Sequence, residues 1–163
     1  MIAYPNMRGL TFCLVVITCL CIGVAKVSAQ AAISLSKGQV VYVPVYSHIY
    51  IGDRERPFLL AVTLSIRNTD RLYPVTIQKV VYYDSNGKRL NDYLEKPIKL
   101  EKISAIRFVV HESDKSGGSG ASFIVEWESE KRVSPPVIET IMIGAQTQQG
   151  ISFTSRGLVI EEK

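Results

Sequence analysis

Arginine and tyrosine side chains gather in one short stretch, which makes it the first candidate for binding chemistry. Residues 46–56 read Y-S-H-I-Y-I-G-D-R-E-R, and the candidate side chains are Tyr46, His48, Tyr50, Asp53, Arg54 and Arg56. Guanidinium groups hold carboxylates or phosphates through paired hydrogen bonds, and tyrosine beside arginine is a favoured interface anchor. Because the charges alternate in sign, the favoured interpretation is a solvated loop that pairs with itself or with Glu112 or Asp114. The same residues are still the best candidates of this chain for a partner-binding surface.

Metal chemistry would depend on His48 and His111, the two histidines of the chain. They would have to converge with carboxylates such as Asp53 or Asp114, because a cation needs three or four ligands. The sequence contains no close metal-ligand spacing. We therefore interpret His48 as packed in an aromatic loop and His111 as lying on a polar strand face, and we predict no metal and no cofactor. His111 and Asp114 stay candidates for partner binding.

Two stretches rich in glycine and serine carry no enzymatic motif. Residues 116–120, S-G-G-S-G, could form a nest of backbone amides for an anion, but a phosphate loop also needs a Lys-Ser/Thr pair that opens a helix. A strand follows here, so we interpret the segment as a flexible hairpin connection. Residues 150–157 contain serines without a G-x-S-x-G motif. No catalytic residue is predicted; enzymatic activity is left open, with a preference against it.

The N-terminal segment has the features of an export signal. Met7-Arg8 precede an apolar run of 15 residues, Leu10 to Val24, and Val27-Ser28-Ala29 supply small residues where a signal peptidase cleaves. The run is shorter than the roughly 20 residues of a transmembrane helix. Residues 1–29 are therefore predicted to be a cleaved signal peptide of a periplasmic or secreted protein. The alternative is a membrane tether formed by an uncleaved signal.

Removal of this segment changes the chemistry of the chain. Cys13, Cys19 and Cys21 would leave with it, so disulfides and thiol catalysis are excluded from the mature protein. The loss of Arg8 and Lys26 takes the 19 basic residues to 17, against 15 acidic residues. No basic run with interleaved aromatic residues survives, which argues against nucleic-acid binding. No membrane span is predicted after cleavage.

The remaining residues alternate between apolar and polar types, as β-strands do. Within residues 58–68, Leu60, Val62, Leu64 and Ile66 are predicted to point inward, and a phase slip near Lys79 indicates a β-bulge or burial on both faces. Asn86-Gly87 predicts a type I′ turn. Later strands are expected to bury the sets Ile106, Phe108, Val110 and Phe123, Val125, Trp127, and finally Ile141 and Ile143. Pro44 predicts an edge strand because it lacks an amide donor.

These patterns predict an all-β fold. About seven or eight strands separated by polar turns are typical of an antiparallel immunoglobulin-like β-sandwich, and a small β-barrel is the alternative. Residues 30–38 are expected to be a loose N-terminal lead, and residues 39–163 a single sandwich domain.

Several longer motifs resemble a known family. They are V-Y-V-P-V-Y-S-H-I-Y at 41–50, G-D-R-E-R-P-F at 52–58, L-S-I-R-N-T-D at 64–70, E-S-D-K-S-G-G-S-G-A at 112–121 and G-I-S-F-T-S-R-G at 150–157. Together they are similar to a bacterial exported family known as domain of unknown function 3124. The resemblance implies a secreted or envelope protein, and it assigns no activity and no catalytic residue.

Three functions are compatible with the sequence. The first is a non-enzymatic binding module of the bacterial envelope that holds a protein or an extended ligand through loops and an edge strand. The second is a structural subunit of an envelope assembly, which would use the Pro44 strand and the Gly-rich tail as contacts. The third is a small metal-dependent hydrolase built on His48, His111 and nearby acids. The sequence ranks them in that order and leaves the oligomeric state open.

Overall fold

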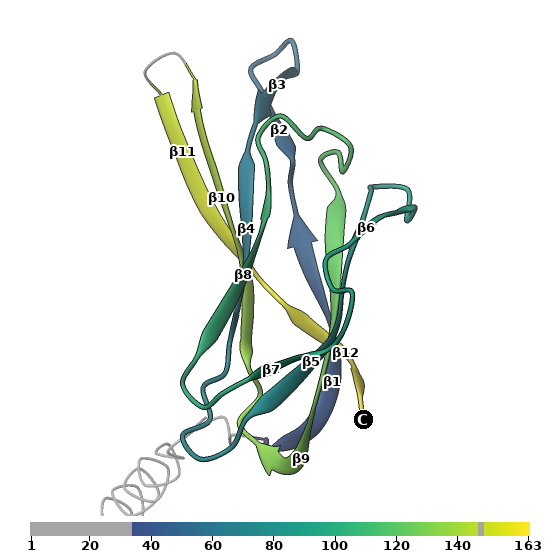
Figure 1. The fold of residues 1–163 in the computed structure, drawn as a ribbon. Helices are drawn as coiled ribbons and strands as arrows, with labels where there is room; N and C mark the ends of the chain where they lie inside the picture. The colour runs from purple at the N-terminus through teal and green to yellow at the C-terminus, as the bar shows by residue number, and fades with distance from the viewer. Residues whose placement is uncertain (1–33, 147–148) are drawn as a thin grey trace, which may run out of the picture. The chain divides into compact units, whose positions relative to one another are not determined.

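The computed structural model describes residues 34–146 and 149–163, and the predicted signal peptide lies outside them. The described residues form strands, turns and loops, with two main antiparallel sheets and a separate two-stranded hairpin (Figure 1). Both main sheets have open edges, so the all-β sandwich is confirmed and the closed barrel is not. The described part of the chain contains no helix of the length and hydropathy that a bilayer span requires.

The larger sheet has the strand order β12-β1-β9-β5-β6, and β7 also pairs with β5. Its strands are β1 (Ser36–Val45), β5 (Val75–Tyr83), β6 (Arg89–Asp92), β7 (Ile98–Leu100), β9 (Ala121–Val133) and β12 (Leu158–Glu162). The smaller sheet has the order β11-β10-β4-β8. Its strands are β4 (Ala61–Arg67), β8 (Ala105–Val110), β10 (Val137–Gln146) and β11 (Gln149–Arg156). The hairpin consists of β2 (His48–Ile51) and β3 (Arg56–Leu59).

The core lies between the two sheets, and alternation of side chains along the strands supplies it. Leu60, Val62, Leu64 and Ile66 from the β4 region are fully buried, as predicted. The opposite sheet contributes Phe123, Val125 and Trp127 from β9, also fully buried. Burial of apolar area on this scale is the main source of stability for a domain without disulfides.

The phase slip near Lys79 has both of its predicted causes. The register of β5 against β9 shifts between Ile77 and Lys79, which is a bulge. Beyond it Val80, Val81 and Tyr82 are all buried, so both faces of this strand are covered.

The inward face predicted for β10 is wrong. Ile143 is 54% exposed and Ile141 is partly exposed, whereas Ile138, Thr140 and Met142 are buried. Thr140 Oγ1 donates a hydrogen bond of 2.7 Å to the Pro44 carbonyl, which lets a polar side chain occupy an inward position. Apolar residues on both faces of the strand hid this choice from the sequence pattern.

The edge position predicted from Pro44 is also wrong for the strand as a whole. β1 lies between β9 and β12, but β12 pairs only with Gln39–Tyr42. Pro44 therefore lies beyond the part of β1 that β12 covers. Its carbonyl bonds to Thr140 and points away from β9, so its missing amide leaves no ladder bond unmade.

β4 and β5, consecutive in sequence, lie in different sheets. Two later segments differ from the sequence prediction. The hairpin after β5 is present, but Gly87 alone of the two turn residues has a positive φ, 78°, so the turn is not type I′. Asp84 Oδ1 shapes it by accepting hydrogen bonds of 2.8 Å from the Asn86 and Lys88 amides. The polar stretch after Gly144 forms most of β11 instead of a tail.

Candidate functional site

The candidate site lies on the β2–β3 hairpin, which extends past one end of the sandwich (Figure 1). His48 pairs with Leu59 and Ile51 with Arg56, so four residue pairs hold the two arms. The turn closes through a hydrogen bond of 3.0 Å from the Glu55 amide to the Gly52 carbonyl. Phe58 is buried in the core and fixes the hairpin base.

The aromatic candidates separate into two groups. His48 Nε2 and the Tyr50 hydroxyl are hydrogen-bonded at 3.2 Å, with their rings edge to face. Tyr50 is 55% exposed, so this pair presents an aromatic surface to solvent. Tyr46 packs edge to face against Phe153 of β11, with ring centroids 5.7 Å apart. Tyr46 thus supports the hairpin base, while His48 and Tyr50 form its exposed surface.

The charged tip has no internal partner within the described residues. Asp53, Arg54, Glu55 and Arg56 are all exposed. None of the ion pairs in residues 34–146 and 149–163 involves Arg54 or Arg56, so the predicted pairing within the loop or with Glu112 or Asp114 is not formed. Ile51, Gly52 and the tip residues line a shallow open depression. Two guanidinium groups are therefore available to an outside partner.

His111 and Asp114 belong to the β8–β9 loop instead. The Asp114 amide donates to the His111 carbonyl at 2.9 Å, and Asp114 Oδ1 accepts from both the amide and the hydroxyl of Ser116. No hydrogen bond or ion pair among the described residues joins them to His48 or to the hairpin arginines. The described part of the chain also contains no group of three or more His, Cys, Asp or Glu side chains placed to share a metal.

The glycine-rich loop has a role that the sequence did not reveal. It connects β8 of one sheet to β9 of the other, so it is a crossover and not a hairpin. The Ser47 amide and hydroxyl both donate to the Gly118 carbonyl, and the Ser85 amide and hydroxyl both donate to the Gly117 carbonyl, each at 3.0 Å. The loop thus ties the hairpin base to the β5–β6 turn.

Tyr82 explains why residue 117 is glycine. A Cβ atom on Gly117 would lie 1.9 Å from the Tyr82 hydroxyl, which is closer than atoms approach. Burial raises the pKa of Tyr82, and the Asp114 carboxylate acts in the same direction. The Ser47 hydroxyl acts against this rise in the pKa of Tyr82. That hydroxyl donates its hydrogen bond to the Gly118 carbonyl, however. The Tyr82 hydroxyl has no hydrogen-bond partner among the described atoms.

Comparison with known proteins identifies the family. The family model described as protein of unknown function (DUF3124) matches residues 38–160. The chain belongs to this family. The match within the DUF3124 family spans the hairpin and the glycine-rich loop, so both are part of the family domain. No curated protein matches the chain.

A solved structure from Thermotoga maritima, titled "Crystal Structure of Thermotoga maritima 1070", has a TM-score of 0.46 and 11% identity to this DUF3124 protein. The alignment covers 78% of this chain and 97% of that chain.

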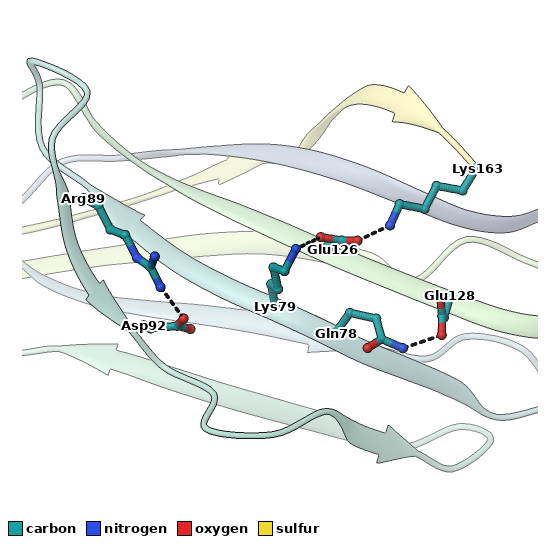
Figure 2. A network of polar contacts seen from close by, with 7 residues as sticks. All are labelled: Gln78, Lys79, Arg89, Asp92, Glu126, Glu128 and Lys163. Atoms are coloured by element: carbon teal, nitrogen blue, oxygen red, sulfur yellow. Dashed lines mark hydrogen bonds and ion pairs between the residues drawn. The ribbon is translucent and has the colours of Figure 1, made fainter.

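A second charged surface of this DUF3124 protein is already neutralised. On the larger sheet, Lys79 and Lys163 both contact Glu126, the first at 3.0 Å, and Gln78 donates to Glu128 (Figure 2). The hydrogen bonds from Lys163 and then Lys79 lower the pKa of Glu126. Arg89 and Asp92 pair at 2.6 Å on the neighbouring strand. These charges satisfy one another, which distinguishes this face from the hairpin tip.

Proposed function

We propose that this protein is an exported, non-enzymatic binding module of the bacterial envelope, and that the β2–β3 hairpin is its partner-binding surface. The observation that carries the proposal is the unpaired tip: Arg54 and Arg56 are exposed and make no ion pair within the described residues. The predicted signal peptide supports export. The exposed His48–Tyr50 pair supplies apolar contact area beside the charges.

Recognition would use geometry that the hairpin already has. Each guanidinium can hold a carboxylate through two parallel hydrogen bonds, and such pairs gain strength when a partner excludes water. Tyr50 contributes a rigid ring with few torsions to immobilise, which favours an interface anchor. Asp53 and Glu55 lie beside the arginines, so a partner must present both signs of charge, and a folded protein does so more readily than a uniformly acidic polymer.

The structural-subunit alternative has one observation in its favour. β12 is the edge strand of the larger sheet, and Leu158, Val159 and Ile160 on it are exposed. An edge strand with apolar side chains can pair with a strand of another copy. Light scattering of the purified protein separates the two proposals, because a subunit of this kind self-associates and a lone module stays monomeric.

The hairpin proposal is tested by photo-crosslinking in cells. A crosslinking amino acid at Tyr50 is expected to give a discrete adduct, which Arg54→Ala/Arg56→Ala weakens at least tenfold. A crosslinker at Lys88, in the exposed β5–β6 turn, is the positional control, and Lys88→Ala/Arg89→Ala is the matched charge control. An adduct at Tyr50 that survives the loss of both hairpin arginines would remove the hairpin from consideration.

A further inference from the structure

Three large apolar side chains are exposed together at the end of the sandwich opposite the hairpin. Leu72 is 73% exposed and Tyr73 is 40% exposed, both in the β4–β5 connection, and Ile103 in the β7–β8 connection is 65% exposed. Figure 1 shows these two connections at the end away from the β2–β3 hairpin. Each of the three therefore keeps 40% or more of its surface in contact with water.

A buried polar pair holds the two connections in place. Asp70 Oδ1 accepts hydrogen bonds from the amides of Leu72 and Tyr73, at 2.8 and 2.9 Å. Asn68 Nδ2 donates to the carbonyls of Tyr73, Leu100 and Glu101, so it joins the second connection to the first. The Ile103 amide donates to the Asp70 carbonyl at 3.3 Å. We call these two residues, Asn68 and Asp70, the clasp; they fix the apolar side chains outward.

The backbone at Ile103 is strained in a way that packing does not explain. Its φ of 54° lies in the left-handed region, where a β-branched residue is an outlier. Most of its side chain lies in solvent, so burial does not compensate for the strain. A strained residue with an exposed apolar side chain points to a binding role for that side chain.

The apolar side chains are flanked by basic ones. Arg71 precedes Leu72 and Lys102 precedes Ile103, and both basic residues are exposed. Lys131 and Arg132, at the end of β9, are also exposed. They lie at the same end of the sandwich, since the amide of nearby Ser134 donates a hydrogen bond of 3.1 Å to Asp70 Oδ2. Within the described residues none of these four enters an ion pair.

The acidic residues of the two connections are already engaged. The carboxylate of Glu101 pairs with Lys99 at 3.2 Å, and the clasp aspartate is buried and fully engaged. Glu130 is exposed and directly precedes the basic residues Lys131 and Arg132 in β9. The end therefore combines outward apolar tips with an excess of positive charge.

We propose that this end docks on the surface of an anionic lipid bilayer, with Leu72 and Ile103 inserted at the boundary of the acyl chains. A bilayer supplies both an apolar layer and negative headgroups within a few ångströms, which is the combination that these loops present. Tyr73 suits the headgroup level, where amphipathic rings are enriched. Docking would turn the hairpin away from the membrane, and it does not depend on the hairpin's partner.

The course of the chain agrees with this orientation. The described domain begins at Ser34, and Arg132 Nη1 donates to the Leu35 carbonyl at 3.0 Å. The N-terminal residues of the domain therefore lie at the basic end. In the alternative in which the predicted signal is not cleaved, its apolar run, Leu10 to Val24, precedes this end of the domain in the sequence.

Tryptophan substitutions test the proposal on the protein purified with the N-terminus that remains after any cleavage of the signal in the cell. The native Trp127 is fully buried, so its emission supplies a constant background. Leu72→Trp and Ile103→Trp are expected to show a blue shift and quenching by brominated lipids on vesicles of 70% phosphatidylcholine and 30% phosphatidylglycerol. Tyr50→Trp, at the opposite end, is expected to show neither. A protein held at the vesicle only by its N-terminal segment would show no quenching at residues 72 and 103, and that result would refute the proposal.

Partitioning measurements give the second test. Leu72→Ser/Ile103→Asn is expected to lower vesicle binding at least tenfold, and Arg71→Gln/Lys102→Gln by about fivefold per charge removed. Pure phosphatidylcholine vesicles are expected to bind weakly, and added salt to weaken binding to the anionic ones. Equal binding to neutral and anionic vesicles contradicts the proposal. So does a concentration-dependent dimer that Leu72→Ser/Ile103→Asn abolishes, because a second copy would then cover this surface.

Discussion

Asp70→Asn is expected to weaken the fold at neutral pH far more than an exposed aspartate substitution. Asp70 is only 8% exposed, and its carboxylate accepts three backbone hydrogen bonds, from Leu72, Tyr73 and Ser134, at 2.8, 2.9 and 3.1 Å. An asparagine keeps one oxygen for the first two donors. Its amide nitrogen then faces the Ser134 amide, so two donors oppose each other. The substitution removes the charge and leaves a buried donor unpaired.

The magnitude follows from these contacts. A buried donor without an acceptor costs about 1–3 kcal/mol, and each remaining bond weakens by about 0.5–1 kcal/mol when its acceptor loses its charge. We expect a loss of about 3 kcal/mol in the free energy of unfolding. With a urea dependence of about 2 kcal/mol/M, the midpoint moves down by about 1.5 M. Asp53→Asn, on the exposed hairpin tip, is the matched control, with an expected change below about 0.5 kcal/mol.

The pH dependence gives a second signature. Hydrogen bonds from Leu72, then Tyr73, hold the pKa of Asp70 below its ordinary value of 3.8. A lowered carboxyl pKa contributes stability that is fully present above 3.8 and is lost as the pH falls through the folded-state pKa. The difference between wild type and Asp70→Asn should therefore be constant from pH 5 to 7 and shrink below 3.8. Urea titrations at several pH values measure it, and a variant within 0.5 kcal/mol of wild type at pH 7 would refute the reasoning.

Two further substitutions test contacts that the sequence did not predict. Gly117→Ala is expected to lower stability by about 2 kcal/mol or more in urea unfolding, because the new methyl overlaps the Tyr82 hydroxyl. Tyr82→Phe removes that partnerless hydroxyl and should recover part of the loss, and full stability of Gly117→Ala alone would contradict the contact. Ile103→Asn is expected to raise stability by about 1 kcal/mol, because asparagine tolerates the left-handed backbone. A lower melting temperature would show instead that the Ile103 side chain supports the fold.

The effects of Ile103→Asn on stability and on vesicle binding distinguish a binding role of Ile103 from a structural one. The asparagine variant should be more stable yet bind vesicles more weakly. Substitution of a residue that supports packing would lower both the stability and the vesicle binding. This contrast tests the role of the sandwich end opposite the hairpin, even without a known partner for the hairpin.

Strict alternation determined much of this fold from the sequence alone. Where large apolar residues alternated with small or polar ones, as in Leu60 to Ile66, the inward face was predicted correctly. The physical reason is local, because successive strand residues point to opposite faces. β10 has apolar residues at both parities, and there a distant contact, from Thr140 to Pro44, decided which face lies inward.

The candidate sites divide in the same way. The sequence alone singled out residues 46–56, because arginine and tyrosine are recognisable by type. Only the tertiary structure separated His111 and Asp114 from them, since the β8–β9 loop uses Asp114 in its own turn. The sequence did not predict the clasp or the exposure of the apolar side chains beside it. Leu72 and Ile103 read there as ordinary apolar residues of two turns, and their exposure depends on Asn68 and Asp70, which reach across connections about 30 residues apart.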